Sequence, residues 1–186
     1  MVELTSLWLP IVLSGVALFF ASFLAWMVLP HHKKDWIGLP DEAGFGKALG
    51  DLNVPVGNYM FPHCATTEEM KSPEFQERQK KGPNGLLQVW PGSCNMGKNM
   101  ACTFLMFLAV SFCLAYLATL GVQPGAEFMD VFRFVGTAGI LTYAAGTLLN
   151  GIWFPRKLIG DILDGVAYGL ITGVIFAATW PAGPTL

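Results

Sequence analysis

The stretch IGDILDGVAYGLITGVIF, residues 159–176, decides the fold class of this chain. Its apolar side chains are typical of a helix buried in a bilayer, although two aspartates, Asp161 and Asp164, stand near its beginning. Three glycines recur at every fourth position, so on a helix they form one stripe of small residues. The stripe consists of Gly165, Gly169 and Gly173. Such a stripe lets a second helix approach closely, which is how helices pack together in membranes.

The whole chain has the composition of a membrane protein. Of its 186 residues, 53% are hydrophobic and 13% are charged, which is too little polar surface to cover a soluble globule. A helix of about 20 apolar residues crosses the hydrocarbon core of a bilayer. Segments of this kind are predicted at 7–29, 99–120, 132–154 and 160–180. We therefore expect an all-α membrane protein, a four-helix bundle that forms a single integral membrane domain.

The distribution of basic residues predicts the orientation of the four spans. Every Lys and Arg except Arg133 lies in the connections that follow the first and third spans. Because basic loops face the cytoplasm, we expect both connections there and both termini outside. The basic cluster HHKK, residues 31–34, follows the first apolar stretch, whereas a secretory signal carries its positive charge in front of that stretch. The first span is therefore predicted to be a retained anchor.

The long connection between the first two spans, residues 30–97, is predicted to form an ordered cytoplasmic cap, because it is rich in aromatic side chains. One helix is predicted over 72–82, with Ser72 as its N-cap, Pro73 at its first position and Gly82 as its stop. A shorter helix is expected within DEAGFGKALGDL, residues 41–52. The remaining segments are interrupted by Pro and Gly every few residues, which predicts extended chain and turns.

The aspartates of the fourth span are the strongest candidates for a site. Asp161 is predicted at the inner membrane interface, and Asp164 about one turn deeper. A carboxylate within a span costs about 2.5–3.5 kcal/mol unless it faces protein or water, so Asp164 is expected to face the bundle. The full candidate set for a ligand or an ion is Asp164, Asp161, Asn150, Tyr168 and Thr172.

Two interpretations of this set remain open. Basic and amide side chains at the same depth, including His31 and His32 after the first span, predict a structural polar belt around Asp164. Ionisable groups within spans are also typical of ion or proton sites. The sequence does not decide between these interpretations.

Metal and cofactor motifs are weak. His63, Cys64 and Cys94, together with His31 and His32, contain the residue types of a zinc site, but their spacing matches no zinc ribbon or finger and no C-x-x-C occurs. No histidine lies within a predicted span, so the paired axial ligands of a haem between helices are missing. We expect no metal site and no cofactor.

Catalytic and nucleic-acid signatures are missing as well. The chain contains no G-x-S-x-G, Walker A, dinucleotide-binding, HExxH or EF-hand motif. The short basic run RQKK, residues 78–81, is too sparse for a nucleic-acid-binding stripe. These observations favour a protein that is not an enzyme. The expected partners are membrane lipids and either other membrane chains or copies of the same chain.

Several longer runs carry a resemblance to a known family. They are LPHHKKDWIGLPDE at 29–42, YMFPHC at 59–64, SPEFQERQKKGPNGLLQVWPG at 72–92 and FMDVFRFVGTAGILTYA at 128–144. They resemble a family of uncharacterised bacterial integral inner-membrane proteins, and the resemblance extends over nearly the whole chain. It implies a multi-pass protein of the bacterial inner membrane, and it implies no activity and no functional residues.

Two functions follow as hypotheses. The first is a non-catalytic accessory or scaffolding subunit of a membrane complex, because the chain has helix-packing stripes and an aromatic cap but no catalytic motif. The second is a small oligomeric transporter or channel with a cation or proton site at the inner face around Asp164.

Overall fold

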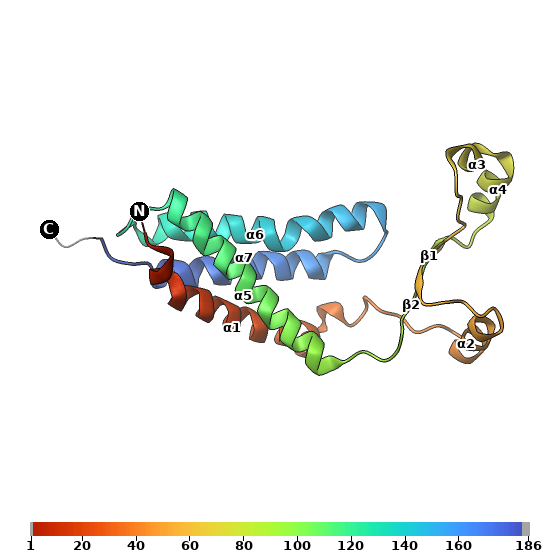
Figure 1. Ribbon diagram of the computed structural model, residues 1–186, viewed down its shortest axis with the longest axis horizontal. Helices are drawn as coiled ribbons and strands as arrows, with labels where there is room; N and C mark the ends of the chain where they lie inside the picture. The colour runs from red at the N-terminus through yellow and green to blue at the C-terminus, as the bar shows by residue number, and fades with distance from the viewer. Residues whose placement is uncertain (1, 184–186) are drawn as a thin grey trace. The chain divides into compact units, whose positions relative to one another are not determined.

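The computed structural model describes residues 2–183 and divides into two compact units, which are considered separately. The first unit contains the chain up to residue 37 and from residue 96 onward, and the second contains residues 38–95. Four helices of the first unit are long and apolar enough to cross a membrane (Figure 1). They are Leu4–Val28, Met96–Gly121, Phe128–Trp153 and Ile159–Ala178. The prediction of four helices long and apolar enough to cross a membrane is therefore confirmed.

The first span is built from three helical pieces. A 3₁₀ turn, η1 (Leu4–Leu7), leads into α1 (Trp8–Phe23), and a π-helical turn, η2 (Leu24–Val28), ends the span. The other spans are single helices: α5 (Met96–Gly121), α6 (Phe128–Trp153) and α7 (Ile159–Ala178). Helix α6 packs along α7, whereas α1 packs against both α5 and α7. Helix α7 also reaches α5, because the ring of Tyr168 lies 5.6 Å from that of Phe107, in an edge-to-face arrangement.

Small residues bring α6 and α7 together. A Cβ atom added to Gly169 would lie 2.4 Å from the backbone nitrogen of Ile140, and one added to Gly173 would lie 2.9 Å from the Cα atom of Gly136. One added to Gly165 would lie 3.0 Å from the Cα atom of Ala144. Separations below about 3.0 Å require movement of the backbone, so larger residues at these positions would force the two helices apart.

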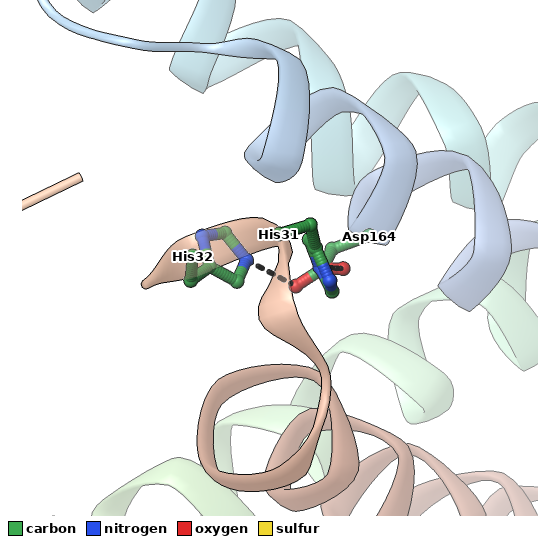
Figure 2. A group of neighbouring side chains, drawn as sticks. All are labelled: His31, His32 and Asp164. Atoms are coloured by element: carbon green, nitrogen blue, oxygen red, sulfur yellow. Dashed lines mark hydrogen bonds and ion pairs between the residues drawn. The ribbon is translucent and has the colours of Figure 1, made fainter. Parts of the chain in front are cut away.

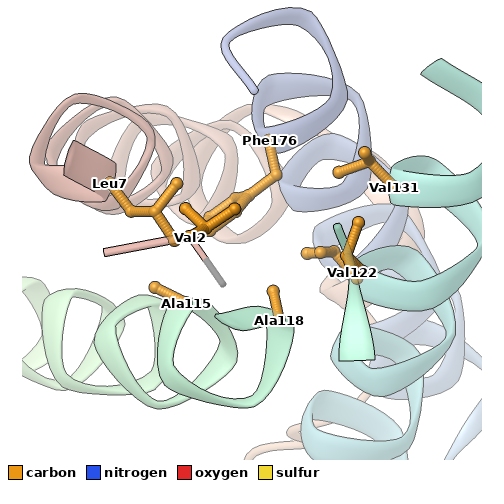
Figure 3. Close-up of a cluster of buried hydrophobic side chains, with 8 residues drawn as sticks. Val2, Leu7, Ala115, Ala118, Val122, Val131 and Phe176 are labelled. Atoms are coloured by element: carbon orange, nitrogen blue, oxygen red, sulfur yellow. The ribbon is translucent and has the colours of Figure 1, made fainter. Parts of the chain in front are cut away.

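A hydrophobic cluster occupies the end of the bundle formed by the start of α1 and the end of α7 (Figure 3). Leu7 and Phe176 are fully buried there, with 0% of their surfaces exposed. The other members come from the N-terminal segment, α5, the α5–α6 connection and α6: Val2, Ala115, Ala118, Val122, Val131 and Val135. The opposite end of α7, which carries Asp164, is held by polar contacts instead.

The second unit, residues 38–95, contains three short helices and two strands. The helices are α2 (Glu42–Asp51), α3 (Thr67–Lys71) and α4 (Pro73–Lys81). Strands β1 (Gly57–Phe61) and β2 (Gly85–Val89) pair in antiparallel register, with Tyr59 opposite Leu87. The prediction of an all-α chain was therefore incomplete, because two of the segments expected to be merely extended form a ladder.

The helix predicted at 72–82 is confirmed with its caps. The hydroxyl of Ser72 accepts a hydrogen bond of 3.2 Å from the backbone N–H of Phe75, and Pro73 occupies the first helical position. Gly82 ends the helix with φ at 65°, in the left-handed region that favours glycine. The shorter helix expected within 41–52 is also present, and the Asp41 carboxylate accepts from the N–H of Gly44.

Candidate functional site

The sequence at the end of the first span turns the chain toward α7. Proline disfavours helical backbone in the preceding residue, and Leu29 is accordingly extended, with φ at −73° and ψ at 149°. Pro30 then begins a 3₁₀ turn, η3 (Pro30–His32). The π-helical turn η2 lies directly before this bend, and single π-helical turns are frequent at functional sites. The bend brings two consecutive histidines to the first turns of α7.

Asp164 is the residue that these histidines contact. It lies in the second turn of α7 and is 9% exposed. Its Oδ1 atom lies 2.9 Å from Nε2 of His31, and its Oδ2 atom lies 3.0 Å from Nε2 of His32 (Figure 2). One carboxylate is therefore shared by two imidazole rings, whose centroids are 4.3 Å apart. We refer to His31, His32 and Asp164 as the histidine–aspartate cluster.

His32 is held from several directions. Its Nδ1 atom lies 2.6 Å from Oδ2 of Asp35, so both ring nitrogens face a carboxylate. The indole of Trp26 stacks on its ring at 3.9 Å, with the planes 5° apart. Gly160 leaves room for it, because a Cβ atom there would lie 2.7 Å from Cε1 of His32. A glycine and a tryptophan from two different helices thus fix the orientation of this ring.

The electrostatics around His32 favour positive charge. Burial lowers the pKa of its imidazole, whereas the hydrogen bonds to Asp35 and Asp164 and the charges of both carboxylates raise it. The raising effects together are larger, so the pKa of His32 lies above its ordinary value. A neutral imidazole can donate only one hydrogen bond, whereas a protonated one can donate to both carboxylates at once. The surroundings of this ring therefore stabilise a cation.

Polar side chains continue from Asp164 into the bundle. The hydroxyl of Tyr168 donates a hydrogen bond of 3.2 Å to Oδ2 of Asp164, and Thr172 donates to the carbonyl of Tyr168 at 2.8 Å. The ring of Tyr143 lies 5.9 Å from that of Tyr168, in an edge-to-face arrangement. The Tyr143 hydroxyl is buried near Thr172 and Ser111 without reaching hydrogen-bond geometry. Three predicted site residues, Asp164, Tyr168 and Thr172, therefore form one line along α7.

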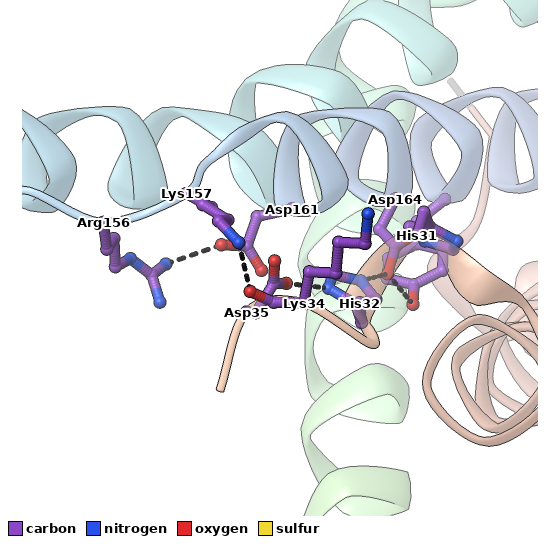
Figure 4. Close-up of polar contacts among 9 residues, drawn as sticks. His31, His32, Lys34, Asp35, Arg156, Lys157, Asp161 and Asp164 are labelled. Atoms are coloured by element: carbon purple, nitrogen blue, oxygen red, sulfur yellow. Dashed lines mark hydrogen bonds and ion pairs between the residues drawn. The ribbon is translucent and has the colours of Figure 1, made fainter. Parts of the chain in front are cut away.

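The other two predicted residues lie apart from this line. Asp161 pairs with Arg156, whose Nη2 atom lies 2.8 Å from Oδ2 of the aspartate (Figure 4). Lys157 donates a hydrogen bond to the carbonyl oxygen of Lys34, which links the α6–α7 connection to the chain after η3. Asn150 is exposed, and the hydrogen bonds of the histidine–aspartate cluster do not include it. Asp161 therefore pairs with Arg156 and is not a member of the cluster.

The weak zinc candidates from the second unit do not assemble. Within residues 2–183, the three side chains with ligand atoms close enough to hold one metal ion are His31, His32 and Asp164. His63 and Cys94 are exposed and Cys64 is half-buried, and they are not part of such a group. The cluster takes two of the five histidines and cysteines considered from the sequence and adds an aspartate from the last span.

From the sequence, His31 and His32 were considered as neighbours of Asp164 and as weak zinc candidates with His63, Cys64 and Cys94, but not as one group with Asp164. A test for haem looks for histidines inside spans, and this pair follows a span. The signal in the sequence that could have identified them was their depth in the membrane. His31 and His32 follow the first span directly after a proline, and the fourth span begins at the same level with Asp164 in its first turns.

No family model, no curated protein and no solved structure matches this chain. The proposals that follow therefore depend on the geometry of the described residues.

Proposed function

We propose that this chain is a non-catalytic accessory or scaffolding subunit of a membrane complex, and that the unit formed by residues 38–95 docks onto a partner chain. One observation carries the proposal: in this unit a single hydrophobic side chain, Phe75, is buried, with 2% of its surface exposed. Burying one such side chain contributes roughly 1.5–3 kcal/mol. Ordering each residue costs about 1.5 kcal/mol, so one buried side chain cannot hold a unit of this length.

The apolar side chains that the unit leaves exposed support docking. Leu86 and Trp90 are 53% and 66% exposed, and Met60 pairs across the ladder with Leu86 at 52% exposure. We refer to these three residues as the apolar ladder face. Exposed apolar groups that lie together are typical of sites where another chain binds. A two-stranded ladder is also marginally stable by itself, which is a second reason to expect a covering partner.

Charge favours a protein partner over the lipid surface. Residues 38–95 contain seven acidic residues and five basic ones, since Asp and Glu stand at 41, 42, 51, 68, 69, 74 and 77 and Lys and Arg at 47, 71, 78, 80 and 81. The unit therefore has a formal charge of −2, from five minus seven. Anionic headgroups attract basic segments, so an acidic unit gains nothing from them.

Location and helix packing complete the proposal. We propose the bacterial inner membrane, with residues 30–97 in the cytoplasm and both termini outside, from the basic residues that follow the first and third spans. The close approaches at Gly165, Gly169 and Gly173 support α6–α7 packing of the GxxxG type within one chain. The apolar sides of α1 and α5 are then left for lipid or for the spans of a partner.

Co-isolation tests the docking face. The full chain and the variants Leu86→Ser, Trp90→Ser and Gln88→Ser are expressed in the native membrane, extracted in a mild lipid-preserving system and compared for bound polypeptides. Gln88 lies between Leu86 and Trp90 on the same exposed side of β2, so Gln88→Ser is a matched control. The proposal expects a reproducible partner that the first two variants lose and the control keeps. A chain that is isolated alone, or a partner kept by all three variants, contradicts it.

A second candidate function is transport of a proton or cation in an oligomer. The observation that favours it is the polar line of Asp164, Tyr168 and Thr172, which extends from the histidine–aspartate cluster into the bundle. Asp164→Asn would then abolish ion or proton flux into proteoliposomes while the chain still assembles. Equal flux in Asp164→Asn and in the unchanged chain would exclude this candidate.

A further inference from the structure

We propose that the histidine–aspartate cluster binds one divalent transition-metal ion, and we take zinc as the ion for comparison and for the test. Each of its three residues offers one ligand atom, and these atoms lie within 4.8 Å of one another. Two imidazole nitrogens and a carboxylate oxygen are ligands that zinc and related first-row ions accept. The inference goes beyond the proposed accessory role and does not depend on it.

The three ligand atoms lie near enough to one another to converge on one zinc ion. Ligand atoms at about 2.0–2.1 Å from zinc in a tetrahedron are roughly 3.3 Å apart. The carboxylate oxygens of Asp164 lie 2.9 Å from Nε2 of His31 and 3.0 Å from Nε2 of His32. These two distances involve different oxygens, and the three ligand atoms together lie within 4.8 Å of one another, so a metal ion that replaces both hydrogen bonds draws the ligand atoms closer by up to about 1.5 Å.

The groups around the three ligands match those that support a metal. A ligating histidine characteristically donates its other N–H to a carboxylate, which fixes the tautomer and makes the ligand more basic. Nδ1 of His32 lies 2.6 Å from Asp35 in this way, which leaves Nε2 for the metal. The Asp164 carboxylate likewise accepts a hydrogen bond from Tyr168, at 3.2 Å. Both supports come from residues that are not themselves ligands.

The size of Gly160 and the flat ring of Trp26 fix the positions of the histidine rings. A Cβ atom on Gly160 would lie 2.7 Å from Cε1 and 2.9 Å from Nδ1 of His32, and 3.3 Å from Cδ2 of His31. Trp26 covers one face of the His32 ring at 3.9 Å. The bundle therefore holds an imidazole at a set place and angle, as a metal site requires.

Charge and access also fit a divalent ion. The carboxylates of Asp164 and Asp35 together balance the two positive charges, so a site with neutral imidazoles has no net charge at the membrane boundary. The side chain of His31 is 24% exposed, so the cluster is open to its surroundings at this residue. Three protein ligands leave one tetrahedral position for water or for a group of another chain.

Metal titration of the full chain tests the site. The protein is purified without a histidine tag, reconstituted in nanodiscs, stripped with a chelator and titrated with zinc against a chromophoric competitor, and bound zinc is measured by mass spectrometry. We expect one zinc per chain. His31→Gln and Asp164→Asn should weaken binding by about 100-fold or more, and Asp35→Asn by about 10–100-fold. His63→Gln removes the remaining histidine, which is exposed in the second unit, and should leave the affinity unchanged.

Several outcomes would contradict the proposed metal site. They are less than one zinc per chain, an affinity that His31→Gln does not change, and an equal loss in His63→Gln. Should Asp164→Asn fail to fold, His31→Gln and Asp35→Asn decide, because both retain the carboxylate of α7. Cobalt binding is an independent test, because the absorption bands of bound cobalt should appear in the visible spectrum and should change in His31→Gln. A chain that binds no zinc but keeps its co-isolated partner refutes the metal site alone.

Discussion

The Oδ2 atom of Asp164 lies 3.0 Å from the Nε2 atom of His32, although 132 positions separate the two residues in the sequence. This contact joins the end of the first span to the beginning of the last. The opposite ends of the same two helices meet in the hydrophobic cluster around Leu7 and Phe176. The four spans of the first unit are therefore held together at one end by apolar contacts and at the other by the histidine–aspartate cluster.

Replacing Asp164 should destabilise the bundle far more than replacing Asp161. Asp164→Ala leaves two imidazoles without their acceptor at a buried position, and a cost of about 2–4 kcal/mol is expected. Asp161→Ala breaks a pair with Arg156, whose side chain is 45% exposed, so its cost should stay within about 1 kcal/mol. Unfolding in mixed detergent micelles measures both variants. Equal costs would mean that the buried cluster contributes no more than the surface pair.

Gly160→Ala should disturb the cluster without replacing any of its members. The added methyl group would lie 2.7 Å from a ring atom of His32, and overpacking of this kind costs about 1–3 kcal/mol. Gly146→Ala is the matched control, because no atom lies within 4 Å of the Cβ position there. That control should be neutral or slightly stabilising, since alanine favours helix. The histidine signals in an NMR spectrum should shift in Gly160→Ala and stay in place in the control.

Gly169→Ala should separate α6 from α7. Its Cβ atom would lie 2.4 Å from the backbone nitrogen of Ile140, which can move only if the helix moves. A loss of about 1–3 kcal/mol is expected. Val174→Leu adds volume on a side of α7 that is 46% exposed and should cost almost nothing. Unfolding of both variants in the same micelles measures the difference, and an unchanged stability in Gly169→Ala would mean that the helices have another way to pack.

Zinc should raise the stability of the first unit, which contains the four spans. At free zinc 100 times above its dissociation constant, binding to the folded state alone adds about 2.7 kcal/mol. His31→Gln should lose this gain, and His63→Gln should keep it, because His63 lies outside the cluster. Thermal unfolding with and without a chelator measures the change. A gain that persists in His31→Gln would place the stabilising metal elsewhere.

The proposed orientation predicts which face of the membrane exposes Cys94. This residue is exposed in the second unit, whereas Cys102 and Cys113 lie in α5. A membrane-impermeant maleimide should label Cys94 in inverted vesicles and fail to label it in intact spheroplasts. Cys94→Ser should remove the signal and so assigns it. Labelling from the outer side would invert the topology.

The parts of the fold that local chemistry determines were predicted from the sequence. Long apolar runs predicted the four spans, and Ser72, Pro73 and Gly82 predicted both ends of α4. The ladder of β1 and β2 was missed because each strand has only five residues, begins at a glycine and lies between two prolines. Its pairing also joins Gly57 to Val89 across a long segment. A pairing of this kind depends on tertiary structure, which no local pattern of five residues encodes.

The candidate site was predicted in part for the same reason. The energetic cost of a carboxylate in a span singled out Asp164, and helical spacing placed Tyr168 and Thr172 on its line. The positions of His31 and His32 depend on the bend after Leu29, which is a property of the folded chain. Asn150 was included for its depth alone, and depth does not determine the direction around the bundle.

The most direct test of the accessory role is native mass spectrometry of the unmodified chain, released from its own membrane with its lipids. The account predicts a reproducible assembly whose mass contains this chain and at least one other polypeptide. An assembly that contains copies of this chain alone would contradict the accessory role and leave the transport candidate at Asp164 in its place.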